Sequence, residues 1–196
     1  WPAGQALLQS FQQSDAFGTS VQWVGLDNFI ALWHDTTYLA SFYTTAWFSI
    51  WVAGLGLTLS LLLAFFADRV VHGAWVYRSL LILPYAVAPV VAGVLWLFLF
   101  SPSVGLVAFG LEKWGVHWNI LLNSNHAMSL IVVASVWKQI TYNFLFFLAG
   151  LQSIPKSLLE AAALDGANEW QRFRTIQFPL LSPTAFFLFV VNTVYA

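Results

Sequence analysis

The stretch WFSIWVAGLGLTLSLLLAFFA, residues 47–67, is the core of a longer run, Thr36 to Ala67, that contains no charged residue. A helix needs about 20 apolar residues to cross the hydrocarbon core of a bilayer. The stretch therefore predicts a membrane-spanning helix, and the adjacent charges of Asp68 and Arg69 mark its end.

The composition of the whole chain agrees with that prediction. Of its 196 residues, 60% are hydrophobic and only 8% are charged, whereas about 25% of residues are charged in a soluble domain. We therefore expect an integral membrane protein. The net charge of −1 and the absence of a long run of like charges give no case for nucleic-acid binding. The lack of cysteine excludes disulfides, iron–sulfur centres and thiolate zinc sites, and no metal site is predicted.

Three further spans are expected. Residues 79–100 form an uncharged run that contains Pro84 and Pro89, which predicts a kinked span. Residues 126–151 predict another, and the apolar run that starts at Thr184 begins a fourth that the 196 residues do not complete. The fold class is all-α, a polytopic helical membrane protein in one transmembrane domain, and we expect an internal piece of a longer chain. Short helices are expected near 28–32 and 104–114.

The distribution of basic residues predicts the orientation. Loops 68–78 and 152–183 carry five Lys and Arg residues, whereas segments 1–35 and 101–125 carry only Lys113. Basic residues are enriched in the short cytoplasmic loops of membrane proteins. Loops 68–78 and 152–183 are therefore expected to face the cytoplasm.

Loop 152–183 contains the sequence Glu160-Ala161-Ala162-Ala163-Leu164-Asp165-Gly166. Its residues favour a helix that ends at Gly166, followed by a second short helix, with Pro179 and Pro183 expected to end helical structure. The small Ala161 and Ala162 allow close approach by another surface, whose cations Glu160 and Asp165 can pair with. An amphipathic helix on the lipid surface is the alternative, and three alanines argue mildly against it because they bury little apolar surface.

This loop resembles the one in the permease subunits of binding-protein-dependent ABC importers. The resemblance rests on residues 148–155, 160–167 and 176–180 together with Pro183. It implies the transmembrane domain of a type I importer, with six spans, of which residues 1–196 would hold the second to the fourth and part of the fifth. It also implies that Glu160 to Gly166 form a coupling helix that seats in a separate ATPase subunit.

The resemblance implies a location in the bacterial inner membrane and a set of partners. They are a second permease subunit in a heterodimer, two ATP-binding subunits and a periplasmic solute-binding protein, with transport by alternating access. The chain has no Walker-type glycine loop, so we expect a transport subunit without cofactor or enzymatic activity of its own, and ATP and Mg²⁺ bound by the ATPase. Residues 83–89, 134–147 and 190–196 resemble the subgroup that carries sn-glycerol 3-phosphate, which leaves glycerophosphodiesters, sugars or other small polar solutes as alternatives.

A lysine in the middle of a predicted span marks a candidate substrate path. Lys138 lies about a dozen residues, or roughly 18 Å, from either end of its span. A charge at that depth costs about 2.5–3.5 kcal/mol, so it has a function by default. The candidate path consists of Lys138, Gln139, Tyr142, Asn143 and Asn192. Lys138 either contacts an anionic substrate or pairs with a group on the partner permease, and interhelical hydrogen bonding is the expected role of Asn192.

Two other classes of function compete. A secondary transporter or channel would have the same composition and a buried lysine, but it needs no cytoplasmic loop for an ATPase. A membrane enzyme or electron carrier is disfavoured because all four histidines (His34, His72, His117 and His126) fall in loops or at a span end, and because neither HExxH nor GxSxG occurs.

Overall fold

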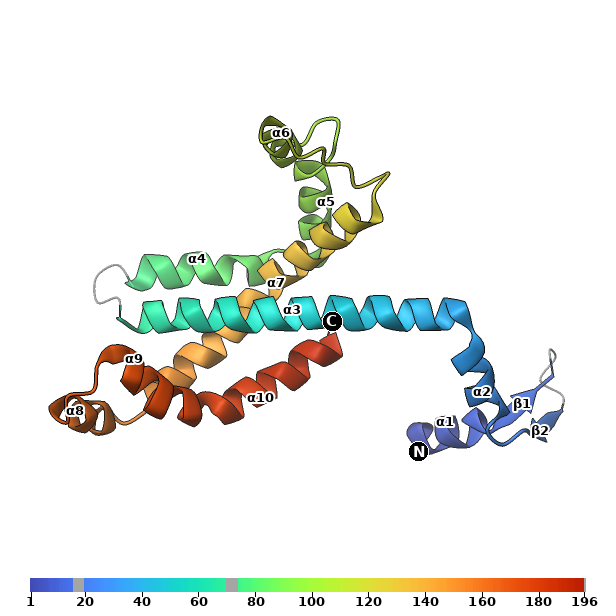
Figure 1. Ribbon diagram of the computed structural model, residues 1–196, viewed down its shortest axis with the longest axis horizontal. Helices are drawn as coiled ribbons and strands as arrows, with labels where there is room; N and C mark the ends of the chain where they lie inside the picture. Colours follow the sequence, from blue (N-terminus) through green and yellow to red (C-terminus); the bar gives the residue numbers. More distant parts are fainter. Residues whose placement is uncertain (16–19, 70–73, 196) are drawn as a thin grey trace. The chain divides into compact units, whose positions relative to one another are not determined.

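The computed structural model describes residues 1–15, 20–69 and 74–195 and is dominated by helices (Figure 1). The chain divides into two compact units, Trp1–Trp47 and Phe48–Ala196. Ala196 and residues 70–73, which include His72 and part of the predicted loop 68–78, lie outside the described residues.

The first unit holds two short helices and a β-hairpin before the first long helix begins. They are α1 (Pro2–Ser10), β1 (Gln12–Ser14), β2 (Val21–Trp23) and α2 (Asp27–His34). The two strands are antiparallel. The short helix predicted near residues 28–32 is confirmed by α2, whereas α1 and the hairpin were not predicted and are a small exception to the all-α expectation.

One side chain and one ring hold this unit together. The Asn28 side-chain amide donates to the carbonyl oxygens of Ser10 and Gln12, at 2.9 and 3.0 Å. The ring of Phe11 stacks on Trp23, with centroids 5.7 Å apart. The hairpin and α2 are therefore fixed to each other by local contacts.

The remaining elements follow in chain order. They are α3 (Thr36–Arg69), α4 (Ala74–Ala86), α5 (Pro89–Leu99), α6 (Leu106–Lys113), α7 (Ser124–Ser153), α8 (Lys156–Leu164), α9 (Glu169–Arg172), the π-helix η1 (Phe173–Gln177) and α10 (Phe178–Tyr195). Among the described residues, three helices are long and apolar enough to cross a membrane: 36–69, 124–153 and 169–195. The spans predicted within 36–67 and 126–151 are confirmed, as is the short helix near 104–114.

The kinked span predicted for residues 79–100 is instead broken into two helices. The axes of α4 and α5 differ by 102° across the break. Ala88 has extended backbone angles, φ −58° and ψ 139°, because a residue before proline is pushed out of the helical region. Pro89 then starts α5, where its missing N–H costs nothing, while Pro84 stays inside α4.

The expectation that Pro179 and Pro183 end helical structure is wrong. Helix α9, η1 and α10 form one continuous helix of 27 residues, Glu169–Tyr195, and Pro183 lies inside it. The wider turn of η1 ends at Gln177, two residues before Pro179. Local π-helical adjustment is one way in which membrane helices accommodate proline. The fourth apolar run is therefore helical well before Thr184.

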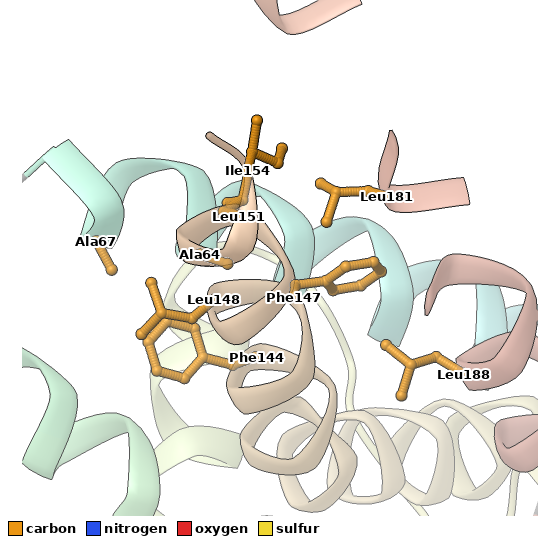
Figure 2. Packing of buried hydrophobic residues seen from close by; sticks show 9 residues of the cluster. All are labelled: Ala64, Ala67, Phe144, Phe147, Leu148, Leu151, Ile154, Leu181 and Leu188. Carbon is orange, nitrogen blue, oxygen red and sulfur yellow. The ribbon is translucent and has the colours of Figure 1, made fainter. Parts of the chain in front are cut away.

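Helix α7 is the centre of the second unit. It contacts α4, α5 and α10, and its apolar residues form a buried cluster with residues of α3 and α10 (Figure 2): Ala64, Ala67, Phe144, Phe147, Leu148, Leu151, Ile154, Leu181 and Leu188. Phe147 lies on the side of α7 that faces Leu181 and Leu188. A Cβ on Gly150 would lie 2.7 Å from Leu181 Cδ2, so glycine at this position lets α7 and α10 approach closely.

A prediction about stability follows from the turn before α6. A Cβ on Gly105 would collide with the carbonyl oxygen of Leu99 and would lie 2.6 Å from that of Ser101, both backbone atoms. We expect Gly105→Ala to destabilise the protein by about 1–3 kcal/mol through overpacking. The measurement is the midpoint of thermal unfolding of the purified protein in detergent.

The matched control is Gly110→Ala in α6. Nothing lies within 4 Å of a Cβ at Gly110, and alanine in a helix is more stable than glycine by roughly 0.5–1 kcal/mol. The control should keep or raise the midpoint. Equal shifts for the two variants would contradict the steric explanation.

Candidate functional site

The polar face of α7 lines a cavity of about 540 Å³ in the second unit. Helices α4 and α10 supply the rest of the wall. The lining residues are Tyr85, Ser135, Lys138, Gln139, Tyr142, Val191, Asn192 and Tyr195. Of the five residues predicted for the substrate path, the structure brings Lys138, Gln139, Tyr142 and Asn192 together around this space. The volume is within the range of small-molecule sites, about 300–1,000 Å³.

Lys138 is the one charged residue in this lining. It lies near the middle of α7 and makes no hydrogen bond or ion pair with any residue that the structure describes. It also lines a second cavity of about 350 Å³ between α5 and α7, together with Ser135. A cation at this depth without a partner on its own chain is available to an anionic group from elsewhere.

Neutral polar groups surround the lysine. Gln139 Oε1 is buried and accepts no hydrogen bond from the described residues. Three tyrosines, Tyr85, Tyr142 and Tyr195, lie in the same lining. Amide and phenol groups can donate to and accept from hydroxyl groups. The arrangement is thus suited to binding a small polar solute that carries negative charge.

Asn143 is placed differently from the prediction. It is fully buried and does not line the cavity. Its side chain exchanges two hydrogen bonds with that of Asn192, at 3.0 and 2.8 Å, which joins α7 to α10. The interhelical role predicted for Asn192 is confirmed, and Asn143, which does not line the cavity, shares it.

The predicted docking loop begins with α8. Glu160, Ala161 and Asp165 are exposed, and Ala162 is half-buried. Gly166 has φ +84°, in the left-handed region that favours glycine. Its N–H donates to the carbonyl of Ala163, and the Ala167 N–H donates to that of Ala162, the two bonds of a Schellman motif. The predicted helix and its glycine end are thus present.

The loop is attached to the membrane helices at two places. Leu159 of α8 packs against the buried cluster. Arg69, at the end of α3, lies 3.6 Å from the carboxylate of Glu169 in α9, and the ring of Phe65 meets that of Phe173 edge-on, with centroids 4.7 Å apart. Since Glu169 is largely exposed, the ring contact contributes more than the ion pair.

No cluster of His, Asp or Glu within residues 1–15, 20–69 and 74–195 is arranged to hold a metal ion. The cavity and the exposed loop are accordingly the two features to compare with known proteins.

Residues 56–196 match the family described as "Binding-protein-dependent transport system inner membrane component". The chain belongs to this family. The match contains the cavity helices and loop 152–183, and the prediction of a membrane transport subunit, as opposed to an enzyme, is confirmed by this membership.

Relatives match the chain over its whole length. It is 61% identical over 196 residues to the "sn-glycerol-3-phosphate transport system permease protein UgpA" of Yersinia enterocolitica, and covers 66% of that protein. It is 60% identical to the protein of the same name from Rhizobium meliloti, of which it covers 67%. The chain thus spans about two thirds of the length of these relatives.

Solved structures of the family give the same fold. A bacterial ABC transporter "involved in the import of the acidic polysaccharide alginate" matches with a TM-score of 0.78 at 25% identity, over 97% of this chain and 65% of that chain. The alginate transporter in complex with its ligand-bound periplasmic protein matches with a TM-score of 0.76 at 24% identity, over 96% of this chain and 65% of that chain, and supports the fold alone.

The structure adds residues that the sequence did not single out. Leu164, next to Asp165 in the loop, is 90% exposed, although no lipid-facing pattern explains an exposed leucine there. In the cavity, Tyr85 and Tyr195 come from helices whose sequence shows no polar periodicity. An isolated large apolar residue beside loop charges would have been a usable signal for Leu164. Tyr85 and Tyr195 lie in segments 83–89 and 190–196, on which the resemblance rests, but it assigned neither tyrosine a role.

A prediction concerns the glycine end of α8. Gly166→Ala forces a side chain into the left-handed region, at a cost of about 1–2 kcal/mol. We expect amide hydrogen exchange in segment 160–167 to rise about 5- to 30-fold, measured by mass spectrometry on the whole protein. Gly166→Asn should have a smaller effect, because asparagine tolerates this conformation. Unchanged exchange in the alanine variant would argue against the motif.

Proposed function

We propose that the protein is the membrane permease subunit of an ATP-driven importer for sn-glycerol 3-phosphate, and that it moves this solute across the bacterial inner membrane by alternating access. The observation that carries the proposal is Lys138, which has no hydrogen-bond or ion-pair partner among the described residues and lines the cavity between α4, α7 and α10 together with tyrosine and amide side chains. The names of the relatives at 60–61% identity support the choice of solute.

The chemistry of the cavity suits this solute. Charge-assisted hydrogen bonds from an ammonium to a phosphate are stronger than those between neutral groups. The glycerol hydroxyls can exchange hydrogen bonds with Gln139, Tyr142 and the other tyrosines. A glycerophosphodiester keeps one negative charge and fits the same proposal, whereas an uncharged sugar would leave the lysine without a partner.

The proposal includes partners. The exposed residues Glu160, Ala161, Asp165 and Gly166 and the half-buried Ala162 would dock on one of two ATP-binding subunits, which bind ATP and Mg²⁺. A second permease subunit would complete the path, and a periplasmic binding protein would deliver the solute. In the orientation predicted from the distribution of Lys and Arg, the described parts of loops 68–78 and 152–183 would face the cytoplasm. The attachment of α9 to α10 in one continuous helix supports transmission of force from the loop to the cavity.

The competing proposal of a secondary transporter or channel has less support. It accounts for a half-buried lysine in the middle of a span but gives no role to the exposed surface of α8. Uptake that followed a proton or sodium gradient without an ATP-binding partner would favour it.

The first functional prediction concerns the phosphate contact. Lys138→Met removes a charge-assisted hydrogen bond worth about 1.5–3 kcal/mol, so the KM for sn-glycerol 3-phosphate should rise about 10- to 100-fold. Lys138→Arg should retain part of the affinity. The measurement is uptake of the labelled solute by proteoliposomes that contain the whole transporter.

Lys113→Met is the matched control, because it removes a cation from α6, whose residues do not line the cavity. Its KM should stay at the wild-type value. Unchanged uptake by Lys138→Met would contradict the proposed contact between Lys138 and the phosphate. Loss of assembly with an unchanged KM in the surviving complex would identify Lys138 as a pairing residue of the partner permease instead.

The second functional prediction concerns the loop. If Leu164 is buried against an ATP-binding subunit, Leu164→Ser removes up to about 1.5–3 kcal/mol of burial. The fraction of ATP-binding subunit that co-purifies at limiting concentration should fall at least tenfold, and uptake should fall with it. Lys156→Ser, at the start of the same helix, is the control. Full association of the Leu164 variant would place the docking surface elsewhere.

A further inference from the structure

Two buried asparagines, 49 residues apart, bind each other across α7 and α10. Asn143 Nδ2 donates to Asn192 Oδ1 at 3.0 Å, and Asn192 Nδ2 donates to Asn143 Oδ1 at 2.8 Å. Asn192 Nδ2 also donates to the Leu188 carbonyl at 2.7 Å. The side chains are 0% and 2% exposed. In a membrane-spanning segment, breaking the pair would leave these amide groups without hydrogen-bond partners, which is costly.

The pair uses the full donor capacity of Asn192. A primary amide has two N–H donors, and those of Asn192 are taken by Asn143 and Leu188. Asn192 therefore has no N–H left for a solute while the pair is intact. The role of Asn192 at the cavity wall is therefore to hold α10 against α7, and it donates no hydrogen bond to a solute.

The pair lies between the two walls of the cavity. Val191, Asn192 and Tyr195 form the α10 wall, and Lys138 and Tyr142 belong to the α7 wall. Asn143 is adjacent to Tyr142 in sequence but is turned to the α10 contact. On α3, Gly56 presents no side chain to the pair, and a Cβ there would already lie 3.5 Å from Asn143 Nδ2. The reciprocal contact is therefore the hydrogen-bonded link between α7 and α10 beside the cavity, in addition to the apolar packing of the two helices.

We propose that Asn143 is a positioning residue for the solute cavity, which acts through Asn192 to hold the α10 wall at a set distance from Lys138. The inference rests on the proposed function, because the cavity is assumed to bind the transported solute. It differs from ordinary helix packing in its consequence: loss of the pair should change the affinity for solute and not only the stability of the protein.

Thr141→Val provides a matched control two residues away. Thr141 is also fully buried on α7, and its hydroxyl donates to the Leu81 carbonyl of α4 at 2.7 Å. This bond joins α7 to another helix and involves no residue of the α10 wall. Both Thr141→Val and Asn143→Leu remove a buried interhelical contact, but only Asn143→Leu removes one that positions the α10 wall.

The experiment measures KM and maximal rate for sn-glycerol 3-phosphate uptake by the whole transporter in proteoliposomes, normalised to folded complex. We expect Asn143→Leu to raise KM at least tenfold and Thr141→Val to leave it within twofold, with comparable falls in the unfolding midpoint. The double variant Asn143→Leu with Asn192→Leu should recover folding, because neither amide is left unpaired, while KM stays raised.

The outcomes separate this inference from the proposed function. A wild-type complex that does not take up sn-glycerol 3-phosphate overturns the proposed solute. Wild-type uptake with a KM for Asn143→Leu within twofold of normal overturns the positioning role. If Asn143→Leu does not fold, the double variant decides: a normal KM there shows that the pair only stabilises the helices.

Discussion

One turn of α7, residues 140–143, fixes three neighbouring helices through hydrogen bonds made without water. Ser60 of α3 donates to the Ile140 carbonyl, Thr141 donates to Leu81 of α4, and Asn143 is paired with Asn192 of α10. In a bilayer the apolar surroundings give helices little reason to associate, so packing and such bonds decide which faces meet. These bonds help to hold α3, α4 and α10 against α7, and Gln139 and Tyr142 beside this turn line the cavity.

Between that turn and α8, close packing of apolar side chains holds α3, α7 and α10 together. The cluster around Phe144 and Phe147 is matched by two small residues on the facing helix α3, Ala64 and Ala67. Van der Waals contacts weaken quickly with distance, so such shape matching replaces the hydrophobic effect as the source of stability. Leu159 of α8 packs against this cluster, and Phe173 of η1 packs against Phe65 of α3. Helix α8 is therefore in contact with a cluster to which α7 and α10, two of the helices that line the cavity, contribute.

Hydropathy predicted the long spans within 36–67 and 126–151 well, since bilayer thickness dictates their length. It failed at the prolines, because their effect depends on neighbours that are distant in sequence. Pro183 is retained inside a continuous helix that contains a π-helical turn at Phe173–Gln177, whereas Pro89 starts a new helix. For the site, a charge at depth identified Lys138. The pairing of Asn143 with Asn192 could not be predicted, because nothing local indicates which helices lie side by side.

The contrast between Lys138 and this polar turn indicates how binding and structure are connected. The side chains of Thr141 and Asn143 both have hydrogen-bond partners within the protein, so each contributes to a rigid wall. Lys138, one turn earlier, has none among the described residues and needs either water or an anion to offset a cost of about 2.5–3.5 kcal/mol. A wall that is already ordered pays little entropy when a solute binds. In the proposed function, a phosphate would gain a charged partner at Lys138 without a rearrangement of the helices around it.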